Sequence, residues 1–265
     1  MKSNVLLFSL ICFSICYADR TVAPAFLWDA SKDSLGRVIT GSPEETSGYW
    51  YDYNDEYDEG QSHFIWPSDV KENDMGNFYG PMIQLYGGIQ GSFILRKKNN
   101  TNNPYVGLGF NIWSEGQEGV DITGWRGLCI EYRSTANLML AIPFENAYEW
   151  GYIEWGYTLK KSDSIIMATI SWNEFRPSAI CCREVPKTEE LVTNVVAIKL
   201  VFSGPDSTTG DFKITKIGSL GTCDGTVPVE SVSLPRSVAS APMARFREVP
   251  GGFEVRDKTL VGKPY

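Results

Sequence analysis

Two stretches of the chain combine aromatic rings with carboxylates, residues 48–60 and residues 144–157. Aromatic side chains gain free energy when their apolar faces leave water, whereas carboxylates are costly to bury without partners. Rings flanked by acids and amides suit a sugar, because C–H groups stack on the ring and hydroxyls bond to the polar groups. The first stretch would equally suit a hydrated loop beside a calcium ion.

In the second stretch the rings of Tyr148, Trp150 and Tyr152 alternate along the chain. In an extended segment this alternation places three rings on one side, about 6–7 Å apart. That interval is close to the length of one sugar unit, so consecutive rings could stack on consecutive sugars. The alternative is a row that faces the core, which the neighbouring acids make costly. The predicted glycan-contact residues are Tyr148, Trp150, Tyr152 and Trp155, with Glu145, Asn146 and Glu149 as polar partners.

Catalytic chemistry has fewer candidates. His63 is the single histidine, and nothing around it resembles the turn that carries a serine or cysteine nucleophile. Glycosidases need two carboxylates across a cleft, and acids do lie near aromatic residues. These acids are Glu145, Glu149, Glu154 and Glu174, none of which has a recognisable catalytic context. A glycoside hydrolase that uses paired carboxylates is therefore the alternative to a binding protein.

A calcium site has weak support from spacing. Asp52, Asn54 and Glu56 alternate as oxygen ligands do, but Tyr57 stands where an EF-hand loop requires glycine. The sequence therefore predicts no EF-hand and no required cofactor. A single structural calcium ion held by Asp29 and Asp211 is retained as an open prediction.

The first 18 residues predict export. Lys2 precedes a short apolar run over residues 5–15, and small residues stand before a cleavage point after Ala18. No later segment is apolar enough to span a membrane. Removal of residues 1–18 leaves 23 basic residues against 32 acidic ones, a net charge of −9. A surface this acidic repels phosphate backbones, which argues against nucleic-acid binding and is compatible with a neutral polysaccharide.

Four cysteines remain after cleavage, which permits two disulfides in an exported protein. Cys181 and Cys182 are adjacent, so a bond between them would close a strained ring. We therefore predict that these two pair with Cys129 and Cys223, in an order that the sequence leaves open.

Short β-rich runs separated by Gly, Asn, Asp and Pro indicate an all-β, antiparallel fold of about 200 residues. The expected strands are 82–86, 92–96, 128–132, 138–142, 164–171, 195–202 and 211–217. The connection over residues 133–137 is hairpin-like, and residues 187–194 could form one or two helical turns. Residues 225–242 have the composition of a linker, and residues 244–256 could form one hairpin.

Two blocks resemble family 11-like carbohydrate-binding modules and their galactose-binding-like relatives. Residues 107–111 and 119–128 are similar to the family's Asp-x-Ser/Thr-x-aromatic-x-Gly-Leu pattern, which leads into a strand. Residues 172–177, with the runs 195–202 and 210–218, resemble the closing half of that fold. The resemblance implies a β-sandwich jelly roll that binds glycan on its concave face or rim loops.

The chain also resembles secreted modules of the Fibrobacter type, in which a Gly-x-Trp-Tyr-x-Tyr-x-Asp segment lies near the start and a cysteine follows the final strand. Trp50 to Asp55 and Cys223 match these features. The resemblance implies that Trp50 and Tyr53 pack at a sheet edge, while Asp55, Asp58 and Glu59 face solvent.

The predicted organisation is a signal peptide (1–18), a β-sandwich domain (19–224), a linker (225–243) and a short C-terminal tail (244–265) that could be a shortened sorting segment. We expect a secreted or cell-surface protein that binds plant cell-wall polysaccharide, namely β-glucan, cellulose or xylan, without hydrolysing it. Its partners would be polysaccharide and the cell envelope. A purely structural cell-surface protein is the third interpretation.

Overall fold

The computed structural model describes residues 20–73, 76–116, 118–145, 147, 154–178 and 186–229, together with the backbone of two strands near the C-terminus. The predicted signal peptide lies outside the described residues. The 3₁₀ turns η1 (Thr123–Trp125) and η3 (Trp172–Glu174) and the helices α1 (Tyr79–Tyr86) and α2 (Thr188–Leu191) accompany the strands. In the described part of the chain, no helix is both long and apolar enough to cross a bilayer.

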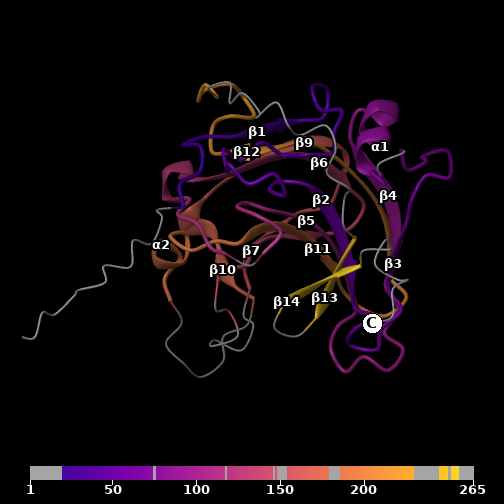
Figure 1. The fold of residues 1–265 in the computed structure, drawn as a ribbon. Helices are drawn as coiled ribbons and strands as arrows, with labels where there is room; N and C mark the ends of the chain where they lie inside the picture. The colour runs from indigo at the N-terminus through magenta and orange to yellow at the C-terminus, as the bar shows by residue number, and fades with distance from the viewer. Residues whose placement is uncertain are drawn as a thin grey trace, which may run out of the picture.

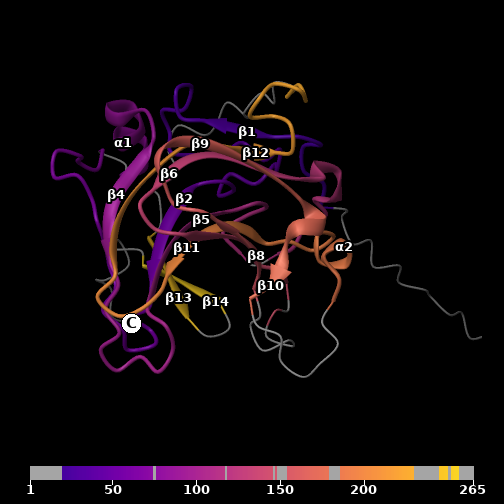
Figure 2. The same ribbon diagram turned by 180° about the vertical axis from the view of Figure 1, so that it is seen from behind.

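Two antiparallel sheets form a sandwich, as Figures 1 and 2 show from opposite sides. The first sheet has the order β3 (His63–Ile65), β4 (Ile89–Ile94), β12 (Thr209–Ser219), β6 (Gly127–Ser134) and β9 (Ser162–Ser171), and β1 (Leu27–Asp29) also pairs with β12. The second sheet has the order β10 (Arg176–Pro177), β8 (Trp155–Leu159), β7 (Leu138–Ile142), β11 (Ala197–Ser203), β5 (Tyr105–Asn111) and β2 (Trp50–Asn54). The predicted antiparallel β-sandwich is confirmed.

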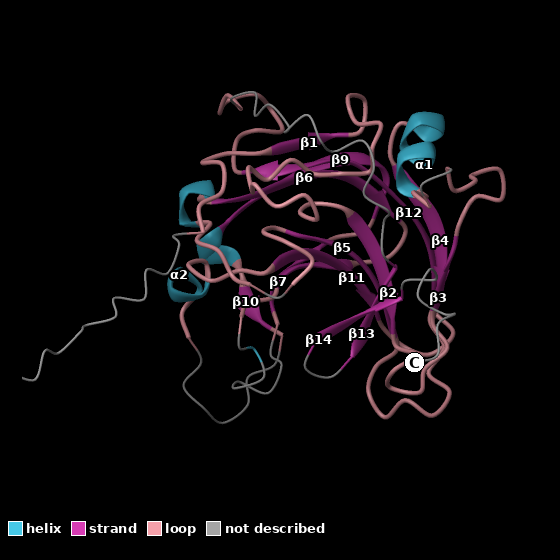
Figure 3. Ribbon diagram, in the orientation of Figure 1, coloured by secondary structure: helices cyan, strands magenta, loops and turns pink. Residues whose placement is uncertain are grey.

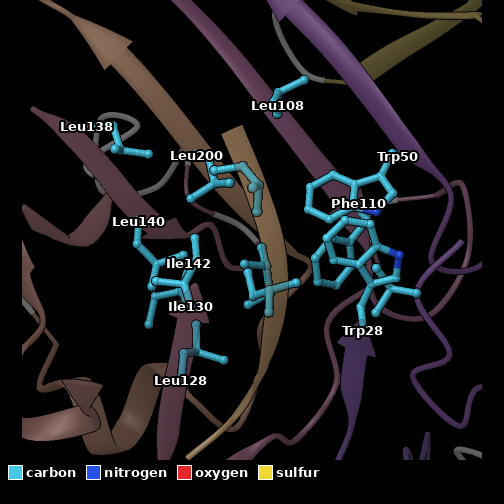
Figure 4. Close-up of a cluster of buried hydrophobic side chains, with 14 of the residues drawn as sticks. Trp28, Trp50, Leu108, Phe110, Leu128, Ile130, Leu138, Leu140, Ile142 and Leu200 are labelled. Atoms are coloured by element: carbon cyan, nitrogen blue, oxygen red, sulfur yellow. The ribbon is translucent and has the colours of Figure 1, made fainter. Parts of the chain in front are cut away.

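The core lies between the sheets and follows the period-two alternation of the strands. In β5 the core side chains are Val106, Leu108 and Phe110, and in β7 they are Leu138, Leu140 and Ile142. Trp50 packs edge-on against Phe110 with ring centroids 5.1 Å apart, and Trp28 lies 5.1 Å from Trp50 in the same way (Figure 4). Burial of each such side chain stabilises the fold by about 2–3 kcal/mol. Trp50 therefore packs on the edge strand β2, as predicted.

Residues 82–86 are not a strand. They form the end of helix α1 (Tyr79–Tyr86), which is drawn beside β4 in Figure 3. Tyr79, Met82 and Ile83 are buried, and their spacing is that of one helix face. Gly87 ends the helix in the left-handed conformation at φ 63°, which glycine adopts without strain. The second helix, α2 (Thr188–Leu191), lies in the predicted helical segment.

The connection over residues 133–137 is not a hairpin, because β6 belongs to the first sheet and β7 to the second. The chain crosses from one layer to the other here. Ser134 is fully buried and donates from its Oγ to the carbonyl oxygen of Ala136 at 2.6 Å, which turns the chain at the crossing.

One disulfide joins Cys129 of β6 to Cys223, which follows β12, across 94 residues of sequence. The predicted pairing of these two cysteines with Cys181 and Cys182 is therefore wrong. The two adjacent cysteines lie outside the described residues. A bond that closes a loop of this size stabilises a fold by about 2–5 kcal/mol.

The predicted C-terminal hairpin is present as β13 (Arg245–Val249) and β14 (Gly252–Arg256), paired antiparallel in a separate two-stranded sheet. β13 lies against β2. In both views the hairpin is on the side of the second sheet that faces away from the first (Figures 1 and 2).

Candidate functional site

The outer face of the second sheet carries a cluster of rings, here called the tyrosine face. Its apolar members are Tyr51, Tyr53, Tyr105, Met139, Ala141 and Val201. They come from β2, β5, β7 and β11, which lie next to one another in the sheet. The cluster exists because alternate residues of these strands point away from the core.

Glycines in β5 provide the space for two of these rings. Tyr51 lies opposite Gly109, and Tyr53 lies opposite Gly107. A Cβ atom at Gly107 would stand 2.1 Å from Cζ of Tyr53, and one at Gly109 would stand 3.0 Å from Cζ of Tyr51. The tyrosines therefore lie flat over β5 and do not extend outward from the edge strand.

The three rings form a row. Ring centroids of Tyr51 and Tyr53 are 6.2 Å apart, and those of Tyr53 and Tyr105 are also 6.2 Å apart. Their planes are tilted by 46° and 56°, so the row is stepped and not flat. The spacing matches the 6–7 Å interval predicted for a glycan-binding row, at different residues.

Polar groups surround the row. The hydroxyl of Tyr51 donates to Oδ1 of Asn111 at 3.1 Å, and that of Tyr105 donates to Oδ2 of Asp58 at 3.2 Å. Lys199 rises from β11 with its Nζ 4.8 Å from the ring centroid of Tyr53 and 4.0 Å from Oε1 of Glu154. Lysine is rarely buried without such neighbours, and Lys199 is only 4% exposed. Amide, carboxylate and ammonium groups thus stand within reach of a ligand that lies along the rings.

Asp55 positions one end of the row. It is fully buried, and its carboxylate accepts hydrogen bonds from the backbone N–H and hydroxyl of Ser62, at 2.9 and 2.7 Å, and from the backbone N–H of Tyr105 at 3.2 Å. The expectation that Asp55 faces solvent is therefore wrong, whereas Glu59 is exposed and Asp58 is half-buried. The carboxylate is tolerated in the interior because three donors replace its water.

The structure places the predicted contact residues in different surroundings. Trp155 is 1% exposed and packs edge-on against Phe144 at 5.6 Å, so its ring belongs to the core and offers no surface for stacking. Glu145 accepts a hydrogen bond from the backbone N–H of Gly119 at 3.1 Å and lies 3.6 Å from the guanidinium of Arg20. The remaining residues, Tyr148, Trp150, Tyr152, Asn146 and Glu149, lie outside the described residues.

The two aspartates proposed to hold calcium are too far apart to share one ion. Asp29 pairs with Lys216, five residues along β12 from Asp211, which corresponds to about 17 Å. Asp29 instead accepts from the hydroxyl of Ser31 at 2.7 Å, and Asp211 from the hydroxyl of Ser92 at 2.6 Å. Within the described residues, no group of three or more acids, histidines and cysteines is arranged to hold a metal ion.

The described carboxylates considered for hydrolysis each have other partners, and Glu149 lies outside the described residues. Glu174 forms a capping box with Ser171 at the start of η3. Hydrogen bonds from the backbone and hydroxyl of Ser171 hold the pKa of Glu174 below its usual range, which does not suit a general acid. Glu154 approaches Lys199 on the second sheet, and Glu145 lies beside Arg20. His63 is exposed on β3, with Nδ1 3.0 Å from the carbonyl oxygen of Gln61.

The sequence contains a signal for the tyrosine face in the segments of β2 and β5. Trp50, Tyr51 and Tyr53 predict a strand with rings on both sides, and Gly107 and Gly109 repeat with the same period. Small residues at alternate positions of one strand provide room for large ones on its neighbour. The sequence does not say that these two strands are adjacent.

No protein-family model and no curated protein sequence matches the chain. Solved structures with a similar fold include a family 11 carbohydrate-binding module of a cellulosomal cellulase of Clostridium thermocellum, at 18% identity over 65% of this chain and 87% of that one, with a TM-score of 0.41. A family 11 module from Clostridium thermocellum in complex with a β-1,3-1,4-mixed-linked tetrasaccharide matches at 15% identity over 74% and 96% of the two chains, with a TM-score of 0.41. A family 29 carbohydrate-binding module matches at 8% identity over 62% and 92%, with a TM-score of 0.28. The predicted likeness to such modules is confirmed at the level of the fold.

Proposed function

We propose that this protein is an exported, non-catalytic module that binds a neutral plant cell-wall polysaccharide along the tyrosine face. The observation that carries the proposal is the row of Tyr51, Tyr53 and Tyr105 at 6.2 Å intervals on the outer side of the second sheet. Aromatic rings on the outside of a sheet are not needed to fill the core, whereas they do provide the apolar surface on which a sugar stacks.

The polar groups around the row would orient a bound sugar chain. A sugar above Tyr51 and Tyr53 would place its hydroxyls near the amide of Asn111 and the ammonium of Lys199. Such groups fix the orientation of the chain, while the rings provide contact area. The acidic mature protein gives an anionic polysaccharide no electrostatic advantage, which favours β-glucan, cellulose or xylan.

The predicted row of Tyr148, Trp150 and Tyr152 remains part of the proposal. Residues 143–154 connect β7 to β8, and both strands belong to the second sheet. These rings are proposed to extend the same site beyond the end of the sheet near Asn111, because Ile142 and Trp155 lie at that end.

The experiment compares the two outer faces of the sandwich. Wild-type mature protein, Tyr53→Ala and Glu131→Gln are tested by affinity electrophoresis in β-glucan and xylan and by retention on cellulose. Loss of one stacking ring should weaken binding about fivefold, because an aromatic contact contributes roughly 1 kcal/mol. Glu131 lies on the first sheet and pairs with Lys216 at 3.2 Å, so its variant is the matched control.

Wild-type protein that is retained by none of the three glycans would overturn the proposal. Equal binding by Tyr53→Ala and wild type would overturn the location of the site. Release of reducing sugar from β-glucan or xylan by the purified protein would instead favour the hydrolase.

A further inference from the structure

We infer that the C-terminal hairpin β13–β14 is a cover for the tyrosine face and competes with glycan for it. The inference rests on the proposed function for the nature of the competitor. The cover itself is inferred from the position of the hairpin, the burial of the face and the length of the connecting chain.

The position of the hairpin is the first observation. β13 lies against β2, the strand that carries Tyr51 and Tyr53. The hairpin does not extend the second sheet, because β13 and β14 pair with each other in a sheet of their own. It therefore rests on the sandwich without a shared ladder of backbone hydrogen bonds.

The second observation is how little of the tyrosine face is exposed. Tyr51 is 7% exposed, Tyr53 9% and Val201 8%, although these side chains point away from the core. The outer face of a sandwich sheet normally remains open to water. On the outer side of the first sheet, the side chain of Lys216 keeps 27% of its surface. The tyrosine face is thus covered, and the hairpin is a described element on that side (Figure 2).

The third observation is that such a cover can detach. A two-stranded hairpin is at best marginally stable alone, so it gains from resting on an apolar surface. Residues 244–265 contain five basic and three acidic residues, whereas the rest of the mature chain is strongly acidic, which favours their association. Fifteen residues, 230–244, separate the hairpin from Val229, and an extended chain of that length reaches about 50 Å. The connection therefore permits the hairpin to leave the face completely.

Because the hairpin is tethered to the sandwich, a weak contact is enough to cover the tyrosine face. A short connection gives the hairpin an effective concentration in the millimolar range, so a millimolar affinity already covers the face about half of the time. The apparent dissociation constant for glycan is inversely proportional to the fraction of molecules in which the face is uncovered. Removal of the hairpin should then strengthen glycan binding about twofold if the face is covered half of the time, and about tenfold if it is covered nine tenths of the time.

The first arm of the test needs no glycan. The mature chain and a chain that ends at Val229, which keeps both sheets and the disulfide, are nitrated with tetranitromethane and mapped by peptide mass spectrometry. Tyr51 and Tyr53 should react several-fold faster in the shorter chain. Tyr57, which is 49% exposed, serves as the internal control and should react equally in both. If Tyr51 and Tyr53 each react at the same rate in the two chains, the hairpin does not cover the tyrosine face.

The second arm measures competition. Binding of β-glucan is titrated with both chains, with Phe246→Asp/Phe253→Asp in the full mature chain, and with a synthetic peptide of residues 244–265 added to the shorter chain. The shorter chain and the double variant should bind more tightly than the mature chain, and the peptide should weaken binding. Faster nitration with unchanged glycan affinity would overturn competition. Absence of glycan binding by both chains would refute the proposed function, while the nitration result would still decide the cover.

Discussion

The outer faces of the two sheets carry different chemistry on the same sandwich. On the first sheet, Lys216 pairs with Glu131 at 3.2 Å, and the hydroxyl of Thr215 donates to the same carboxylate at 2.7 Å. On the second sheet, tyrosines lie over glycines, and the buried Lys199 is among the rings. The first arrangement is a solvated sheet surface of the ordinary kind. The second is not required by the fold, and we propose that it binds a ligand.

The comparison also separates the two sides of the second sheet. Its inner side contributes Trp155 and Phe110 to the core, and its outer side carries Tyr51 and Tyr53. Aromatic residues on adjacent positions of one sheet thus have opposite roles. Substitutions on the inner side should change stability, and those on the outer side should change binding.

The largest effect is expected at Trp155. Trp155→Ala should lower the free energy of unfolding by about 3–5 kcal/mol, because a fully buried indole leaves a large cavity. Thr158→Ala, an exposed position on the same strand, should change it by less than about 0.5 kcal/mol. Urea denaturation measures both. If Trp155→Ala unfolds like wild type but loses glycan affinity, its side chain is a contact residue and not a core residue.

The second-largest effect on stability is expected from removal of the disulfide. Cys129→Ser/Cys223→Ser should lower the free energy of unfolding by about 2–4 kcal/mol, because a cross-link between distant residues restricts the unfolded chain. Reducing agent should destabilise the wild type by a similar amount and should not further destabilise the double variant. A wild-type melting curve that does not respond to reduction, with loss of the bond verified by mass, would contradict this.

A smaller effect is expected on the tyrosine face. Gly107→Ala should cost about 1–3 kcal/mol and weaken glycan binding, because the new methyl group forces Tyr53 to move. Gly124→Ala is the matched control, since its Cβ would have its nearest neighbour at 3.9 Å. Calorimetric melting and glycan titration should separate the two variants. Normal binding by Gly107→Ala would mean that the position of this ring does not matter.

The smallest effect concerns pH at the edge of the first sheet. Partial burial alone would raise the pKa of Asp29, but hydrogen bonds from Ser31 and the charges of Lys216 and Lys32 lower it overall. A lowered folded-state pKa adds stability above the unfolded-state pKa, and this stability disappears as pH falls through the folded value. Asp29→Asn should therefore cost less than about 1 kcal/mol at pH 7, since solvent screens the site, and the cost should vanish in acid. A cost that stays constant from pH 7 to pH 2 would exclude this origin.

Much of the fold could be predicted from local alternation. The patterns of β7 and β12 mark strands because their apolar core residues recur at every second position. The sequence predicts a strand over residues 82–86 because five mostly apolar residues fit both a strand and the end of a helix; the signals that distinguish the helix are Tyr79 and Gly87. The crossing at residues 133–137 could not be predicted, since a short polar turn does not specify whether the next strand stays in its layer.

The site was less predictable for a physical reason. Alternation identifies the two sides of a strand, but not which side meets the other sheet when both sides carry rings. Trp155 lies in the core, whereas Tyr53 lies on the outer side of the sheet. The cysteine pairing also depends on tertiary proximity, because Cys129 and Cys223 meet only after β6 and β12 pair.

The bond between Cys129 and Cys223 has a mechanical consequence. β12 pairs with β1, β4 and β6, and the chain that leads to the C-terminal tail leaves just beyond it. A pull on the tail would otherwise peel β12 away from its neighbours one residue at a time. The disulfide transfers that pull to β6 as well, so β12 and β6 carry the force together. A domain held by its tail and dragged by a bound fibre would in this way resist detachment as one unit.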